Sequence, residues 1–86
     1  MAIRRNGEWL TATVDSELVM MSAASGHYVG LSEVGARIWE LIEPPLELDA
    51  LCARLVEEFD VTPQACRADV QSFLAELARH GAVAMD

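Results

Sequence analysis

The side chains with the greatest chemical potential in this 86-residue sequence are two cysteines and two histidines. They are Cys52, Cys66, His27 and His80. Together they could ligate zinc, but their spacing matches no compact zinc pattern. A nucleophilic cysteine needs an electropositive, partly exposed environment. Both cysteines instead fall on apolar helical faces, where a free thiol behaves as a small hydrophobe. We therefore expect structural cysteines and no metal site.

Acidic side chains are numerous but dispersed. The chain has 14 acidic and 6 basic residues, which gives a formal net charge of −8. No pair of carboxylates stands out as a general acid and base, and no phosphate-binding loop or nucleophile elbow is present. We therefore expect no catalytic residue, no cofactor and no enzymatic activity. The charge also opposes binding to nucleic acid or to an anionic membrane.

The length predicts one domain over residues 1–86, because so short a chain has room for a single core. A hydrophobic fraction of 52% favours an ordered globule. The apolar runs are too short to cross a bilayer, and the N-terminal stretch lacks the apolar core of a signal peptide. We expect a cytoplasmic protein with reduced thiols, monomeric or weakly dimeric.

Short β-type runs fill the first part of the sequence. Their alternation and their β-branched residues predict strands over Trp9–Val14, Leu18–Met21 and His27–Leu31. Turn-forming residues separate the runs, including Gly26, which tolerates a positive φ. Three short strands joined in this way predict an antiparallel meander.

Helical spacing of apolar residues begins after the third predicted strand. The predicted helices run from the N-cap Ser32 to Pro44–Pro45, over Glu47–Phe59, and from the N-cap Thr62 to Gly81. A short extended piece over Ala82–Met85 completes the chain. Strands followed by three helices predict an α+β fold, a winged helix-turn-helix with its three-stranded antiparallel sheet first.

The third predicted strand, His27–Leu31, lacks the usual protection of a sheet edge. Natural edge strands are blunted by lysine, proline or inward-pointing charges. This strand carries no charge apart from His27 when it is protonated, and Gly30 would let another backbone approach closely. An extended peptide could therefore add itself to the sheet as a further strand, gaining main-chain hydrogen bonds.

Two segments resemble the PqqD-like family. The first is residues 26–42, GHYVGLSEVGARIWELI, which is similar to the family pattern aromatic, x, Leu, Asn or Ser, two residues, Gly, two residues, Ile-Trp-x-Leu. The second is residues 69–81, where Asp-Val-x-x-Phe-Leu-x-x-Leu-x-x-x-Gly resembles the family's last helix. Ser32 stands where the family often has Asn, and it keeps the N-cap chemistry. The likeness spans about residues 8–85.

The resemblance implies a binding function. The family includes the pyrroloquinoline-quinone chaperone and the elements that recognise precursor peptides in ribosomal-peptide pathways, which are free-standing proteins in lasso-peptide systems. It implies that the chain holds the leader segment of a precursor peptide by β-augmentation. The partners implied are that peptide and a maturation enzyme, either a leader peptidase or a radical enzyme.

The resemblance also implies where the peptide lies, between the third strand and the third helix. The implied peptide-binding residues are His27, Tyr28, Val29, Gly30 and Leu31 on the strand, and Arg67, Val70, Gln71 and Leu74 on the helix. Val70 and Leu74 would receive apolar side chains, and Arg67 would pair with an acidic group. The same apolar spacing is more often that of ordinary core residues, so a core role for Val70 and Leu74 also stays open.

Other functions also stay open. Winged helices often bind DNA, but the predicted third helix is nearly neutral and the whole chain is acidic, which opposes phosphate contacts. A stabilising subunit of a folded protein would equally lack catalytic residues. Within the peptide-binding hypothesis, lasso-peptide maturation and pyrroloquinoline-quinone biosynthesis are both compatible with the sequence.

Overall fold

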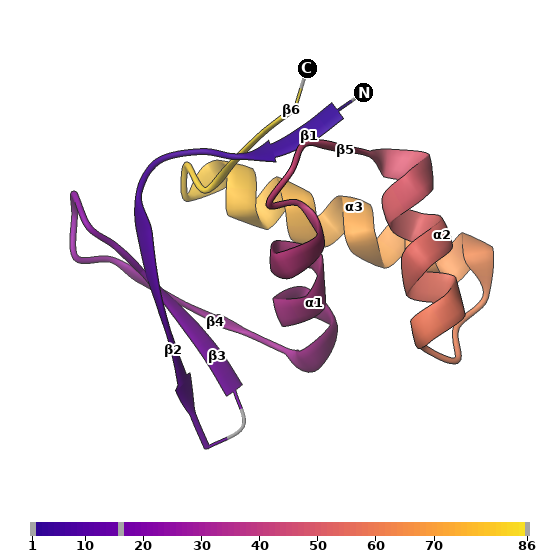
Figure 1. The fold of residues 1–86 in the computed structure, drawn as a ribbon, viewed down its shortest axis with the longest axis horizontal. Helices are drawn as coiled ribbons and strands as arrows, with labels where there is room; N and C mark the ends of the chain where they lie inside the picture. Colours follow the sequence, from indigo (N-terminus) through magenta and orange to yellow (C-terminus); the bar gives the residue numbers. More distant parts are fainter. Residues whose placement is uncertain (1, 16, 86) are drawn as a thin grey trace.

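The computed structural model describes residues 2–15 and 17–85. Within these residues the chain forms two three-stranded antiparallel sheets and three helices (Figure 1). The elements are β1 Ala2–Arg5, β2 Trp9–Val14, β3 Glu17–Ser22, β4 Tyr28–Leu31, α1 Glu33–Leu41, β5 Leu46–Glu47, α2 Leu48–Glu58, α3 Pro63–Arg79 and β6 Val83–Met85. The predicted α+β class, with a sheet followed by three helices, is confirmed.

The predicted meander is the sheet β2-β3-β4. Its register pairs Thr11 with Met20 and Met20 with Val29, so that these three side chains share one face. Met20 is completely buried on this face, which packs against α1. Gly26, in the turn before β4, has a φ of 73°, the left-handed conformation expected of glycine there.

The second sheet, with strand order β5-β1-β6, is the part of the fold that the sequence did not predict, apart from β6 as a short extended piece. β1 lies between a two-residue strand and the C-terminal strand, and Ile3 at its centre is fully buried. The strands β1 and β6 therefore run side by side above the helices (Figure 1). This pairing keeps the C-terminal segment away from β4.

Both predicted N-caps form. The Ser32 hydroxyl accepts a hydrogen bond from the Gly35 amide at 3.1 Å, and the Thr62 hydroxyl accepts one from the Ala65 amide at 3.2 Å. Capping satisfies amide groups that would otherwise be unpaired in the first turn of each helix. Because Ser32 follows the last residue of β4, its cap fixes the sharp change from strand to helix beside the candidate site.

The core lies between the helices and the inner faces of both sheets. It includes both thiols, since Cys52 and Cys66 are free and buried, as expected for structural cysteines. Burial raises the pKa of the Cys52 thiol. Arg5 connects β1 to α1, because its guanidinium donates to the Trp39 carbonyl at 3.0 Å and lies 4.4 Å from the centre of the Trp39 ring. None of the helices described could traverse a bilayer, since each is too short or too polar.

Candidate peptide-binding site

β4 is an outer strand of its sheet. The strand order β2-β3-β4 gives it a single neighbour, β3, and the C-terminal strand β6 belongs to the other sheet. Neither a fourth strand nor the described part of the C-terminal tail therefore occupies the far edge of β4. This edge offers backbone groups of the kind that β-augmentation requires.

The hydrogen-bond register identifies which backbone groups face that edge. The Ser22 amide donates to the His27 carbonyl at 2.8 Å, so these two residues form a hydrogen-bonded pair between β3 and β4. In an antiparallel sheet such pairs alternate with pairs whose amides and carbonyls point away. The amides and carbonyls of Tyr28 and Gly30 therefore point outward, and no turn, loop or cap hydrogen bond of the described backbone engages them.

Side chains on β4 alternate between the core and the solvent. Leu31 is buried and Val29 is half-buried, whereas the Tyr28 side chain is 68% exposed. Gly30 adds no side chain to the outer face, and a Cβ built there would meet nothing within 4 Å. A second backbone could therefore approach β4 at this position without steric hindrance.

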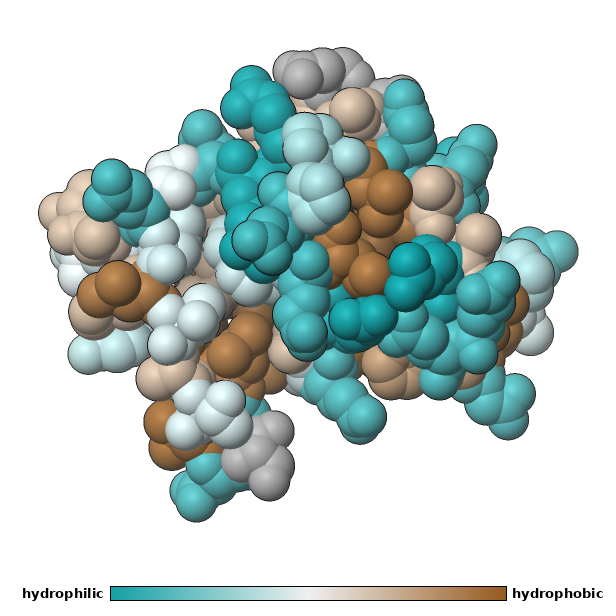
Figure 2. Space-filling model, viewed as in Figure 1, coloured by the Kyte–Doolittle hydropathy of each residue, from teal (hydrophilic) through white to brown (hydrophobic). Residues whose placement is uncertain are grey.

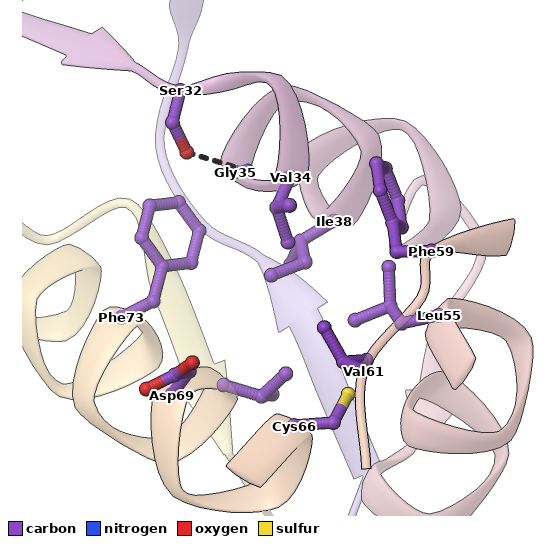
Figure 3. Close-up of a pocket in the computed structure, with 11 residues that line it drawn as sticks. Ser32, Val34, Gly35, Ile38, Leu55, Phe59, Val61, Cys66, Asp69 and Phe73 are labelled. Carbon is purple, nitrogen blue, oxygen red and sulfur yellow. Dashed lines mark hydrogen bonds between the residues drawn. The ribbon is translucent and has the colours of Figure 1, made fainter. Parts of the chain in front are cut away.

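An apolar cavity of about 280 Å³ opens immediately after β4, between the first turn of α1 and α3 (Figure 3). The cavity wall is formed by Ser32, Val34, Gly35, Ile38, Leu55, Phe59, Val61, Cys66, Asp69, Val70 and Phe73. Asp69 is the one ionisable carboxylate among them and lies on an exposed position of α3. The cavity has the size and apolar character of a subsite for one or two hydrophobic side chains.

Gly35 in the family-like motif has a packing role in this cavity. A Cβ at this position would lie 3.0 Å from two atoms of the Phe73 ring. Glycine therefore lets the aromatic ring of α3 lie directly against the first turn of α1. Phe73 was not among the residues predicted for the site, yet it lines the cavity from α3, across from the first turn of α1 (Figure 3).

The residues predicted on α3 do not form one wall beside β4. Val70 and Leu74 are each only 1% exposed and belong to the core, although Val70 also contributes to the cavity. Arg67 forms an ion pair with Asp49 of α2, so it lies on the α2 side of the helix. Gln71 is exposed, four residues further along on that same side.

The opposite flank of α3 is the one that approaches β4. His80 at the end of the helix lies with its Nδ1 2.9 Å from Nε2 of His27, just before β4. At about 100° per residue, Asp69, Phe73 and His80 fall on one side of the buried stripe and Arg67 on the other. The helical repeat predicted the buried stripe, and the structure places Arg67 on the flank away from His27, so its role in peptide binding stays a prediction.

Ion pairs hold the helices together around the site. Arg37 of α1 donates to Glu58 of α2 at 2.6 Å, and Arg67 donates to Asp49. The hydrogen bond from Arg67 lowers the pKa of Asp49, and the hydrogen bond from Arg37 lowers that of Glu58. In the described structure Arg67 thus already has an acidic partner within the chain.

The lowered pKa of Glu58 predicts a pH-dependent contribution to stability. A carboxyl with a lower pKa in the folded state stabilises the fold above its unfolded pKa and loses this effect as the pH falls through the folded pKa. We expect the Tm difference between wild type and Arg37→Met to shrink as the pH drops from neutral to below about 4. Thermal unfolding followed by circular dichroism measures this difference. A Tm difference that stays constant over this range would contradict the assignment.

The fold is a small α+β domain in which an open sheet edge lies beside an apolar cavity, and sequence comparison identifies its family. Residues 17–83 match the family described as coenzyme PQQ synthesis protein D (PqqD), and the chain belongs to this family. Among curated proteins, no sequence matches the chain at a significant level.

Two solved structures are similar over nearly the whole chain. One is TbiB1 in complex with the TbiA(beta) leader peptide, with 28% identity, a TM-score of 0.79, and coverage of 92% of this chain and 93% of that one. The other is a lasso peptide synthetase B1 complexed with the leader peptide, with 20% identity, a TM-score of 0.82, and coverage of 96% and 98%. At its lower identity the second comparison supports the fold alone.

Proposed function

We propose that this chain binds the leader segment of a ribosomally made precursor peptide as an additional strand beside β4. The observation that carries the proposal is the outward-facing backbone of Tyr28 and Gly30 next to the apolar cavity at the start of α1. The similar TbiB1 structure holds a leader peptide, which supports the same class of ligand here. The chain acts without chemistry of its own and presents the peptide to a maturation enzyme, a leader peptidase or a radical enzyme, in the cytoplasm.

The two parts of the site have different tasks. Backbone pairing along His27–Leu31 accepts any extended chain, since main-chain groups are the same for every residue except proline. The cavity supplies selectivity, because a hydrophobic side chain that leaves water contributes about 1.5–3 kcal/mol. Both terms are insensitive to ionic strength, so we propose that leader affinity depends weakly on salt.

A lasso-peptide pathway is the context that we propose first, because the 28% identical neighbour is a leader-peptide complex and the sequence resembles a family that includes the free-standing recognition elements of lasso-peptide systems. A peptide chaperone in pyrroloquinoline quinone biosynthesis is a second candidate, favoured by the description of the matched family. Both contexts use the same site. They differ in the precursor peptide, so titration with each type of leader segment separates them.

A charge placed in the cavity tests whether the cavity holds an apolar side chain of the leader. Val34, in the first turn of α1, is 37% exposed and lines the cavity. Val34→Asp should weaken binding of the leader segment about tenfold, because an apolar side chain of the leader would then lie in the cavity beside a carboxylate. The helix should tolerate the change, since an acidic residue is favourable in a first turn. Fluorescence anisotropy with a labelled leader segment of a precursor peptide measures the affinity.

Met85→Asp is the matched control for this experiment. Met85 is 38% exposed, almost the same as Val34, but it lies on β6 in the other sheet. This variant should bind the leader segment as wild type does. Equal affinities of the wild type, Val34→Asp and Met85→Asp would show that the cavity is not part of the peptide-binding site. Absence of binding to the wild-type chain would refute the proposed function itself.

A further inference from the structure

Two imidazole rings meet at the end of β4 that lies away from the cavity. Nε2 of His27, just before β4, lies 2.9 Å from Nδ1 of His80 at the C-cap of α3, and the ring centroids are 4.8 Å apart. At this distance one of the facing nitrogens donates a hydrogen and the other accepts it. We call these two residues the histidine pair. His27 is exposed and His80 is half-buried, so a ligand can reach both rings.

The histidine pair lies on the face of the sheet that a guest strand shares with the helices. Alternation places the His27 side chain on the same face as Val29 and Leu31, whereas Tyr28 and Glu8 occupy positions of the opposite face. The backbone groups of the first three residues face β3, so an antiparallel guest strand would meet them as non-hydrogen-bonded pairs. The opposed Cβ atoms of such pairs are about 4.5–5.5 Å apart. A guest residue opposite His27 therefore places its side chain against the histidine pair.

An antiparallel guest strand would meet the two ends of the site in a fixed order. Antiparallel pairing is the more stable arrangement per residue. In this arrangement the guest residues opposite Leu31, Val29 and His27 follow one another at every second position and point to the same face. The first of them lies nearest the cavity, which opens after β4, and the last lies at the histidine pair. The two ends of the site thus receive side chains four positions apart in the guest.

Charges around the histidine pair favour an acidic side chain in the guest. Oε1 of Glu76 lies 3.6 Å from Nε2 of His80, but the other carboxylate oxygen already accepts a hydrogen bond from Arg79 at 2.6 Å. These two side chains of α3 offset each other's charge. The turn of residues 22–26 and the segment 81–82, which flank the pair in the chain, contain no ionisable side chain. A proton on either ring therefore adds positive charge that has no carboxylate of its own.

Elsewhere on the helices the positive charges already have partners. The chain has a formal net charge of −8, and hydrophilic side chains cover much of the helical part of the molecule in Figure 2. Arg37, Arg54 and Arg67 each form an ion pair with a carboxylate of the chain. An ordinary imidazole gains its proton as the pH falls from about 8 to about 5. The histidine pair can therefore offer a guest carboxylate two charge-assisted hydrogen bonds.

We propose that the histidine pair is a specificity subsite that holds an Asp or Glu side chain of the leader, four positions to the C-terminal side of the apolar residue in the cavity. This inference rests on the proposed function and names a second side chain that the leader carries. In the free chain the facing nitrogens share one hydrogen, whereas in the complex each ring donates to a carboxylate oxygen. An apolar cavity at one end of β4 and a charged subsite at the other fix the register of the guest, which backbone pairing alone does not specify.

The subsite predicts that leader affinity increases as the pH falls from about 8 to about 6. A carboxylate binds protonated rings more tightly than neutral ones, so leader binding and proton uptake strengthen each other. A Gln side chain at the same position carries no charge and lacks this coupling. Below about pH 4 the effect disappears, because the carboxyl of the leader is then protonated.

Two series of labelled leader segments of a precursor peptide test the subsite in the full chain. Each segment carries Glu at one position in the first series and Gln at the same position in the second. Fluorescence anisotropy at about pH 6 and about pH 8 gives the affinities for wild type, His27→Gln and His80→Gln. Arg54→Gln is the control, because it removes a positive charge from an exposed position of α2. Thermal unfolding checks that each variant folds.

We expect wild type at about pH 6 to bind Glu about three- to tenfold more tightly than Gln at one position, four residues after the apolar residue in the cavity. The preference should fall below about twofold at about pH 8, where the rings are neutral. It should be lost in His27→Gln and in His80→Gln, and Arg54→Gln should keep the wild-type preference.

Equal affinities of the Glu and Gln segments at every position at the lower pH would overturn this inference and leave the proposed function intact. A preference for Glu that persists in both histidine variants would assign the carboxylate to another cation and would overturn the inference as well. A wild-type chain that binds no segment of either series overturns the proposed function itself.

Discussion

Gly30→Pro is expected to weaken leader binding by about 10- to 100-fold and to leave the fold intact. The Gly30 amide points away from β3, so proline at this position removes no hydrogen bond of the sheet. It does remove the donor offered to a guest strand and leaves a carbonyl of that strand unpaired, which costs about 1–3 kcal/mol. Fluorescence anisotropy gives the affinity, and far-ultraviolet circular dichroism checks the fold.

Thr11→Pro is the matched control, because β2 is the other edge of the same sheet. The Ala23 amide donates to the Glu8 carbonyl at 3.0 Å, and the alternation that follows directs the backbone groups of Thr11 outward from the sheet. Proline there should affect stability as Gly30→Pro does but should leave leader affinity unchanged. Equal losses of affinity in the two variants would contradict a site on β4.

Leu74→Ala should lower the free energy of unfolding by about 2–5 kcal/mol, the usual cost of truncating a buried leucine. Leu74 is 1% exposed and packs in the core. Gln71→Ala, one helical turn earlier on an exposed position, should change the free energy by less than about 0.5 kcal/mol. Urea denaturation measures both variants.

This comparison separates the two interpretations of the α3 stripe. A core residue determines stability and affects leader affinity only through partial unfolding. If Leu74→Ala instead retained wild-type stability and bound the leader poorly, Leu74 would line an open groove, contrary to its burial. The leader affinity of each variant is therefore measured at a denaturant concentration low enough that the variant stays folded.

Local signals in the sequence were sufficient to predict the strands of the sheet β2-β3-β4 and the three helices. Alternation predicted the three strands of the meander, and the caps Ser32 and Thr62 marked two helix starts that the structure confirms. These signals are local, because a strand or a cap depends on residues within a few positions. The pairing of β1 with a two-residue strand and with the C-terminus is non-local, and so short a strand has no periodicity to detect.

The candidate site could be predicted only in part for the same reason. The residues of β4 and their edge position follow from strand order, which a meander predicts. The helical repeat gives the centre of the buried stripe of α3, but either flank could face β4. The choice depends on contacts such as Arg67 with Asp49 and His80 with His27, which join residues far apart in the chain.

The apolar cavity likewise depends on distant residues. It forms where α1, α3 and the segment after α2 meet, and Gly35 is the one feature of its sequence motif that points to close packing there. The partner of that glycine, Phe73, lies 38 positions later in the sequence. The motif in α1 therefore does not indicate which residue of α3 packs against Gly35.

Amide hydrogen exchange by NMR, with and without a saturating leader segment, is the most direct test of guest-strand addition. If the peptide pairs with β4, exchange of the outward-facing Gly30 amide should slow at least about tenfold, while the Thr11 amide on the opposite edge should keep its free rate. Unchanged exchange at Gly30 in a saturated complex, or protection at Thr11 instead, would contradict binding beside β4.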